Sequence, residues 1–108
     1  MTRIYELRTY VAEPGRIDAL RERFRDHTVA LFDRHGITSI GYWVEAENPE
    51  TLVYLLAHAD RASATASWDA FRADLEWQAV KAESEKDGPV VRSITSAFLE
   101  PTDFSALR

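Results

Sequence analysis

The chain has 108 residues, 13 Lys and Arg against 18 Asp and Glu, and no cysteine. The lack of cysteine excludes disulfides, thiolate metal sites and a cysteine nucleophile, and the formal net charge of -5 disfavours a general nucleic-acid-binding surface. Three Trp, four Tyr and five Phe are many for one small core, so we expect some of them to be buried against a second subunit or around a ligand.

The N-terminal segment predicts a β-strand. Residues 3–11 alternate between two faces, one with Tyr5, Leu7, Thr9 and Val11 and the other with Ile4, Glu6, Arg8 and Tyr10. Neither face is simply polar, so we expect both faces to be covered. Early charges argue against a signal peptide, and the longest nearly uncharged apolar run, residues 52–59, is too short to span a bilayer. We therefore expect a cytoplasmic protein with no membrane contact.

A long helix is predicted over residues 16–34. Ile17, Leu20, Phe24 and Leu31 recur at helical spacing, and Gly36 suits a left-handed cap that ends the helix near His35. His27 falls three residues after Phe24 and four before Leu31. This spacing places His27 on or beside the buried side of the helix.

Two further strands are predicted over residues 37–47 and 51–59. Asn48-Pro49 marks a turn between them, and the short connection indicates an antiparallel hairpin. With residues 47–50 as the loop, Trp43 lies opposite Tyr54 and Ser39 lies opposite His58. The continuous apolar run in the third strand indicates burial on both of its faces.

The rest of the chain predicts a second helix and a fourth strand. Asp60 or Ser63 caps the helix, Asp74 caps a short continuation of it, and residues 89–99 alternate as a strand. The order β-α-β-β-α-β is that of an α+β, ferredoxin-like domain with a four-stranded antiparallel sheet, here covering residues 1–108. Because helices cover one face only, an apolar second face predicts a homodimer, a dimeric α+β barrel.

Several motifs resemble the NIPSNAP family over nearly the whole chain. They are residues 4–10 (Ile-Tyr-Glu-Leu-Arg-Thr-Tyr), Pro14-Gly15, residues 32–36, Gly41-Tyr42-Trp43, residues 52–57, the run from Trp68 to Trp77, and residues 101–105. The chain departs from the family pattern at Leu75, where Pro is common, and near His58, where an aromatic residue is common. The resemblance implies a branch of the dimeric α+β barrel superfamily, which includes cofactor-free monooxygenases, haem-degrading enzymes and isomerases, but no settled reaction.

Candidate site residues follow from chemistry and spacing. Glu6, Arg8 and Tyr10 share one face of the first strand, so Glu6 could hold Arg8 for binding a carboxylate or enolate. By analogy with the superfamily, Arg8 would lie near His27, with His27 as the catalytic base and Arg8 steadying an oxyanion. The alternatives are a structural ion pair and a core histidine.

Trp43, Tyr54, Trp68, Phe71 and Trp77 are candidate walls of an aromatic ligand pocket, the alternative being ordinary packing. The three histidines suit no metal site, and residues 62–85 lack the axial histidine of haem-degrading relatives, so we expect no cofactor. The leading hypothesis is a homodimer, or a larger homo-oligomer, that binds a small organic molecule and acts as a cofactor-independent monooxygenase or isomerase. The alternative is a non-catalytic assembly or interaction module.

Overall fold

The structure, a computed structural model, describes residues 3–108. Four strands form one antiparallel sheet in the order β2-β3-β1-β4. They are β1 (Ile4–Ala12), β2 (Thr38–Glu45), β3 (Asn48–His58) and β4 (Val91–Leu99). The predicted ferredoxin-like β-α-β-β-α-β order and the antiparallel sheet are confirmed.

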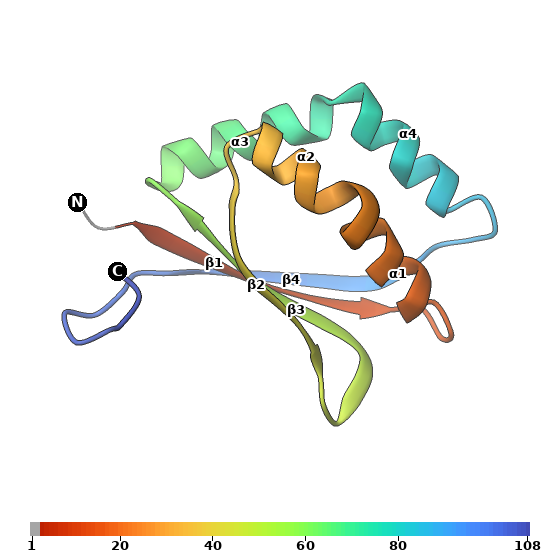
Figure 1. The fold of residues 1–108 in the computed structure, drawn as a ribbon, viewed down its shortest axis with the longest axis horizontal. Coiled ribbons are helices and arrows are strands. Elements are labelled where there is room, and N and C mark those ends of the chain that lie inside the picture. Colours follow the sequence, from red (N-terminus) through yellow and green to blue (C-terminus); the bar gives the residue numbers. More distant parts are fainter. Residues whose placement is uncertain (1–2) are drawn as a thin grey trace.

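The helices lie together on one face of the sheet (Figure 1). They are α1 (Ile17–Arg23), a π-helical turn η1 (Phe24–Thr28), α2 (Val29–Arg34), α3 (Arg61–Ala73) and α4 (Leu75–Ser84). The predicted caps are present, because Asp60 accepts from the Ser63 amide and Asp74 accepts from the Glu76 amide. Gly36 has the positive φ of 76° that the end of α2 requires. Within residues 3–108, none of the helices has the length and apolar character needed to cross a membrane.

The π-helical turn changes which side chains of the first helical segment face the sheet. Its i→i+5 hydrogen bonding widens the turn, and the Thr28 hydroxyl donates to the carbonyl of Arg23 at 3.3 Å. As a result Phe24 and Thr28 are buried, while His27 is exposed. Of the two predicted places for His27, on or beside the buried side of this helix, the structure excludes the first.

The β2–β3 hairpin differs from the predicted register. Tyr42 pairs with Tyr54 and Trp43 with Val53, and the strands meet at residues 46–47 instead of 47–50. Asn48 and Pro49 belong to β3 itself, at its start, where only β2 lies alongside and a missing N–H is tolerated. Since side chains alternate, this one-residue shift puts Trp43 and Tyr54 on opposite faces.

Ser39 likewise pairs with Leu56, not with His58 as predicted.

Ring contacts fill the space between helices and sheet. Phe24 lies 5.2 Å from Tyr54 and 5.6 Å from Tyr10, measured between ring centroids, and Phe32 lies 5.0 Å from Phe71. Much of the aromatic surplus is thus absorbed by a core inside one chain.

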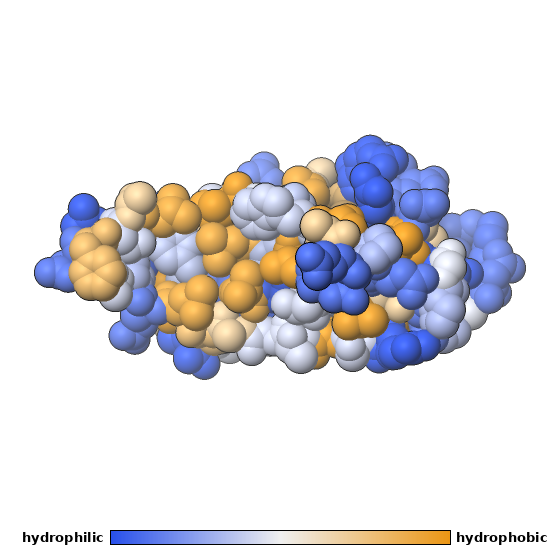
Figure 2. All heavy atoms as spheres, turned by 90° about the horizontal axis from the view of Figure 1, so that it is seen from below, coloured by the Kyte–Doolittle hydropathy of each residue, from blue (hydrophilic) through white to orange (hydrophobic). Residues whose placement is uncertain are grey.

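The opposite face of the sheet is also apolar, as the two-sided strands predicted. Leu7, Trp43 and Leu99 are 36%, 55% and 42% exposed, and Val53 and Leu55 lie on the same face by register. Figure 2 shows this side of the molecule, with hydrophobic residues gathered over its middle. None of the helices within residues 3–108 covers this face.

Candidate functional site

Glu6 is the centre of a hydrogen-bond network on the helix side of the sheet. It is only 2% exposed, and its carboxylate accepts from four side chains. The donors are Arg8 Nη1 at 2.9 Å, His58 Nε2 at 2.9 Å, Trp68 Nε1 at 2.8 Å and Ser96 Oγ at 2.7 Å. Because an ionised carboxylate only accepts, Nε2 of His58 carries the proton in this bond. The four donors come from β1, β3, α3 and β4, so this carboxylate links three strands and one helix.

The surroundings of Glu6 favour its ionised form. Burial alone would raise the pKa, but the bonds from His58, Trp68, Ser96 and Arg8 outweigh burial and lower the pKa of Glu6 from 4.5 to about 2. Glu6 is therefore a permanent negative charge near neutral pH, and it is a poor proton acceptor.

Arg8 joins this carboxylate to two tyrosine hydroxyls. Its Nη1 donates to Glu6, as the two-residue spacing predicted, while Nε donates to the Tyr54 hydroxyl at 2.8 Å and Nη2 to the Tyr10 hydroxyl at 3.2 Å. The guanidinium lies over the Trp68 ring, 4.3 Å from its centroid. Burial opposes the charge, yet the oxygens of Tyr10, Tyr54 and Glu6 raise the pKa of Arg8 above its usual value.

The network ends at the Tyr10 hydroxyl. Tyr54 is fully buried, and its hydroxyl donates to that of Tyr10 at 3.0 Å; burial raises the pKa of Tyr54 well above 10. Tyr10 thus accepts from both Tyr54 and Arg8. Among residues 3–108 no acceptor takes the hydrogen of the Tyr10 hydroxyl, so this O–H is the free donor at the end of the chain of bonds.

Strand β4 leaves one side of the network open to solvent. The helices pack mainly against β2 and β3, whereas Ile94 and Ser96, which pair with Tyr10 and Arg8, face the helix side and are exposed. Ile94 is 50% exposed and the Arg8 side chain is 15% exposed. A small molecule could therefore approach Arg8 and Tyr10 along β4.

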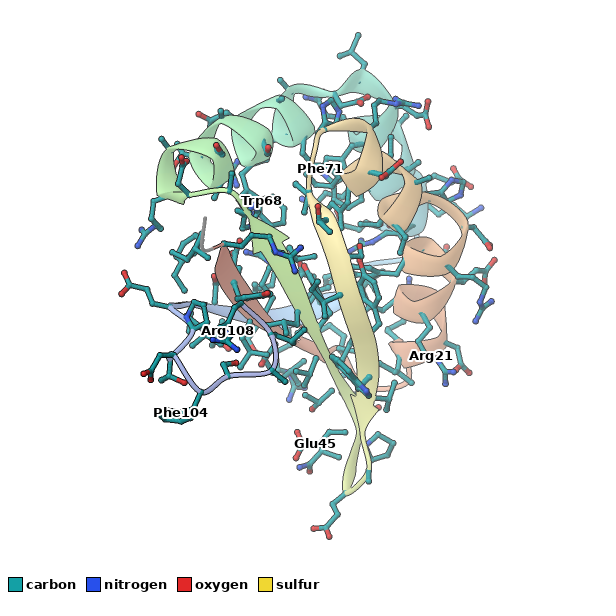
Figure 3. All side chains as sticks on the ribbon, turned by 60° about the vertical axis from the view of Figure 1, so that its left-hand side comes forward. Arg21, Glu45, Trp68, Phe71, Phe104 and Arg108 are labelled. Atoms are coloured by element: carbon teal, nitrogen blue, oxygen red, sulfur yellow. The ribbon has the colours of Figure 1, made fainter. Side chains whose placement is uncertain are left out.

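The predicted aromatic wall is divided between the two faces. Trp68 and Phe71 lie between α3 and the sheet (Figure 3), and Trp77 packs on Phe71 with 4.7 Å between ring centroids. Trp43 instead lies on the outer face over Gly41, where an added Cβ would come within 2.5 Å of the indole. The missing side chain of Gly41 thus leaves room for the indole of Trp43, and Trp43 is not part of the wall.

His27 and Arg8 are not brought together. His27 lies in a groove between α1, η1 and α4, with Arg23 and Ser84, and the groove has a volume of about 430 Å³. No hydrogen bond within residues 3–108 links His27 to the network of Arg8. The predicted pairing of a His27 base with an Arg8 oxyanion site therefore does not form, because the π-helical turn directs His27 outward.

His58 and Ser96 are members of the network that the sequence pattern did not single out. His58 is the one basic residue in the apolar run of residues 52–59, and a buried His in that position needs a polar partner. The sequence therefore held a signal that pointed to His58, whereas nothing in it pointed to Ser96. Within the described part of the chain, no group of three or more His, Asp or Glu side chains is arranged to hold a metal ion.

Comparisons with known proteins agree with this architecture. The NIPSNAP family profile matches residues 5–106. A NIPSNAP family protein from Agrobacterium tumefaciens is 24% identical, with 98% of this chain and 99% of that chain covered and a TM-score of 0.87. A NIPSNAP-like domain protein from Burkholderia xenovorans is 21% identical over 96% of this chain and 89% of that chain, with a TM-score of 0.83.

A more distant structural relative comes from Nitrosomonas europaea, where it is a candidate antibiotic biosynthesis monooxygenase. It is 11% identical, with 97% of this chain and 95% of that chain covered and a TM-score of 0.68. At these identities the likeness shows the fold alone. A search of curated proteins found no match.

Proposed function

The chain belongs to the NIPSNAP family, and from that premise we propose that it is a homodimer that binds a small hydrophobic or aromatic molecule between sheet and helices, with one oxygen of that molecule at Tyr10 and Arg8. The observation that carries this proposal is the free O–H of Tyr10 at the end of the buried network that holds Arg8. Such a donor beside a guanidinium suits a carbonyl, phenolate or carboxylate oxygen.

The Arg8 guanidinium supports the same ligand chemistry. It has five N–H donors, of which the three bonds to Glu6, Tyr10 and Tyr54 use three. The Glu6 carboxylate, the Tyr54 hydroxyl and the rings of Trp68 and Tyr10 hold the group in one orientation. Preorganised donors of this kind stabilise an oxyanion without reorganising when the charge appears.

The apolar body of the ligand would lie along the exposed part of β4, over Ile94 and beside the ring of Tyr10. An enolate or phenolate is the charged form through which both cofactor-independent monooxygenation and isomerisation pass. The geometry supports binding of that form. It does not supply a base near Arg8, since Glu6 has a pKa of about 2 and His27 lies in the separate groove.

The homodimer is proposed from the outer face of the sheet. Leu7, Trp43 and Leu99 are exposed there with no covering helix, and a contiguous apolar patch of this kind marks an interaction site. A second copy placed sheet to sheet would bury it on both sides. Light scattering at micromolar concentration should give twice the mass of one chain, and Leu7→Glu should give a monomer.

The alternative function is a non-catalytic assembly module. One observation favours it: Trp68, Phe71 and Trp77 pack closely on one another, with ring centroids 5.7 Å and 4.7 Å apart. In that case the Arg8 network would serve only to fasten the helices to the sheet.

The test is a ligand screen with a matched pair of tyrosine variants. Phenols, quinones and polyketide-like acids should raise the Tm of the natural protein, and Tyr10→Phe should abolish the shift. Tyr5→Phe is the control, because it removes a hydroxyl from the same strand on the other face of the sheet. A screen without any shift, or equal shifts in Tyr10→Phe, would favour the assembly module.

A further inference from the structure

Arg23 is a buried guanidinium without a carboxylate partner. It is 6% exposed, lies over the Trp77 ring at 5.3 Å from its centroid, and donates from Nη1 to the Ser84 hydroxyl at 3.1 Å. Within residues 3–108 its Nε has no hydrogen-bond partner, and no carboxylate forms a salt bridge with it. A buried charge with no directly bonded carboxylate is costly, and burial lowers the pKa of Arg23 even though Tyr10, Glu85 and Tyr54 act in the opposite direction.

The end of α4 compensates only part of this charge. Ser84 is the last residue of α4, where the helix dipole places about half a negative charge. Arg16 shares the same position, because its Nη2 donates to the Ser84 carbonyl at 3.0 Å. Two guanidinium groups thus face one helix end, and Glu85 beyond that end acts on Arg23 through space without forming a salt bridge with it among the described residues.

The groove that Arg23 lines has the size of a small-molecule site. Its volume is about 430 Å³, and its lining includes Ala19 and Val80 as well as Ser84. Binding sites for small molecules fall in this size range and combine apolar walls with few polar groups. His27, which the sequence pattern placed on or beside the buried side of the first helix, also lines this groove.

The mouth of the groove carries the opposite charge. Glu22 and Asp26 both line it and are exposed. Neither forms a salt bridge among the described residues, unlike the neighbouring Glu83, which pairs with Lys86 at 2.8 Å. The site is therefore positive where it is buried and negative where it is open.

From this arrangement we propose that the groove between α1, η1 and α4 binds a small zwitterion of the amino-acid class. The carboxylate bonds to the Arg23 guanidinium, which Ser84 helps to hold in place; the ammonium lies between Glu22 and Asp26, and an apolar side chain packs on Ala19 and Val80. A simple anion would pass two carboxylates to reach Arg23, and a simple cation would meet a guanidinium at the buried end. Only a molecule that carries both charges can pair with Arg23 at the buried end and with the two carboxylates at the open end.

A matched set of three probes tests the need for both charges. Leucine carries both groups, 4-methylpentanoate lacks the ammonium, and 3-methylbutylamine lacks the carboxylate. Each is titrated into the full chain by calorimetry and by ¹H–¹⁵N spectra, beside a panel of the other amino acids. We expect at least one amino acid of the panel to bind roughly tenfold more tightly than its deaminated and decarboxylated analogues, with shifts at Ala19, Val80 and Ser84.

Variants then separate the two ends of the site. Arg23→Gln should abolish binding of the zwitterion. The double variant Glu22→Gln/Asp26→Asn changes only exposed positions, so it should fold; it should weaken the zwitterion and strengthen 4-methylpentanoate. Glu47→Gln, in the β2–β3 hairpin, removes one exposed carboxylate elsewhere and should change neither affinity.

Three outcomes would overturn the proposal: no amino acid binds in the millimolar range, the analogues bind as well as the zwitterion, or the shifts lie away from the groove. The site is independent of the Arg8 network. Tyr10→Phe should leave zwitterion binding intact, and the double variant Glu22→Gln/Asp26→Asn should leave phenol binding intact, so failure of either proposal is seen separately.

Discussion

Arg8 and Arg23 are both largely buried guanidinium groups, but they are neutralised in different ways. Arg8 pairs with Glu6 and donates to two tyrosine hydroxyls, whereas Arg23 has one serine hydroxyl and the end of α4. The first charge is matched by residues that the sheet register holds in place. The second is matched only in part, and we propose that a ligand completes it.

The largest expected effect comes from breaking the matched charge. Glu6→Gln leaves Arg8 buried without its carboxylate, which should lower the free energy of unfolding by about 3 kcal/mol. The exposed Glu83→Gln should cost less than about 1 kcal/mol, because surface pairs contribute little. Urea unfolding of both variants gives the comparison. Equal costs would mean that Glu6 does not hold the fold together.

Acid should break the same pair without a mutation. The pKa of Glu6 is lowered from 4.5 to about 2, so its contribution to stability is complete above about pH 4.5 and is lost as the pH falls towards 2. Asp74 titrates in the same range, because the bonds from His35, the Glu76 amide and Arg34 lower its pKa to about 2.

The variants separate these two acids. In unfolding curves measured from pH 6 to pH 2, Glu6→Gln should show a smaller loss of stability on acidification than the natural protein. Asp74→Asn should remove a smaller part of the acid-induced loss of stability, since Asp74 lies nearer the surface. An unchanged pH profile in Glu6→Gln would show that the carboxylate is not held ionised.

The network of Arg8 was partly predictable, and its failures have local causes. Strand alternation alone placed Glu6, Arg8 and Tyr10 on one face, because a period of two leaves no other arrangement. His27 was misplaced because a π-helical turn rotates it outward, and Trp43 because the hairpin register is shifted by one residue. Neither a π-helical turn nor the exact start of a hairpin can be recognised from the hydrophobic periodicity of the sequence.

Arg23 was not predictable for a further reason. Its partners depend on how α1 meets the C-terminal end of α4, some sixty residues later in the chain. Spacing within one element predicts which side chains share a face. It does not predict which charge from another helix will be opposite, so the unmatched arginine emerges only from the packed structure.

Replacing each arginine in turn should distinguish the two sites directly. Arg8→Met leaves Glu6 buried and unpaired with a guanidinium, and it should cost about 3 kcal/mol, as in the reverse deletion. Arg23→Met removes a charge that forms no salt bridge with a carboxylate among the described residues, and the guanidinium it replaces lies over the apolar ring of Trp77. It should therefore change stability by less than about 1 kcal/mol, or increase it. Equal losses for the two variants would show that Arg23 has a hidden partner within the chain.

The smallest effects concern two serine hydroxyls that bond to these charged groups. Ser96 donates to Glu6 at 2.7 Å, and Ser84 accepts from Arg23 at 3.1 Å while donating to the Lys81 carbonyl. Ser96→Ala should cost about 1 kcal/mol, less than the 1.5–3 kcal/mol usual for a charged partner, because Ser96 is exposed and water can replace it. It should also move the acid transition to higher pH, since one donor to Glu6 is lost.

Ser84→Ala should cost less than Ser96→Ala, because water in the groove can rehydrate Arg23, and it should leave the acid transition in place. Its effect should appear in binding instead, as weaker affinity for the zwitterion with no change in phenol binding. The same chemical deletion thus reports stability at one arginine and ligand affinity at the other. A shift of the acid transition by Ser84→Ala would show that the two charged regions are coupled. That result would contradict the proposal that the two sites are independent.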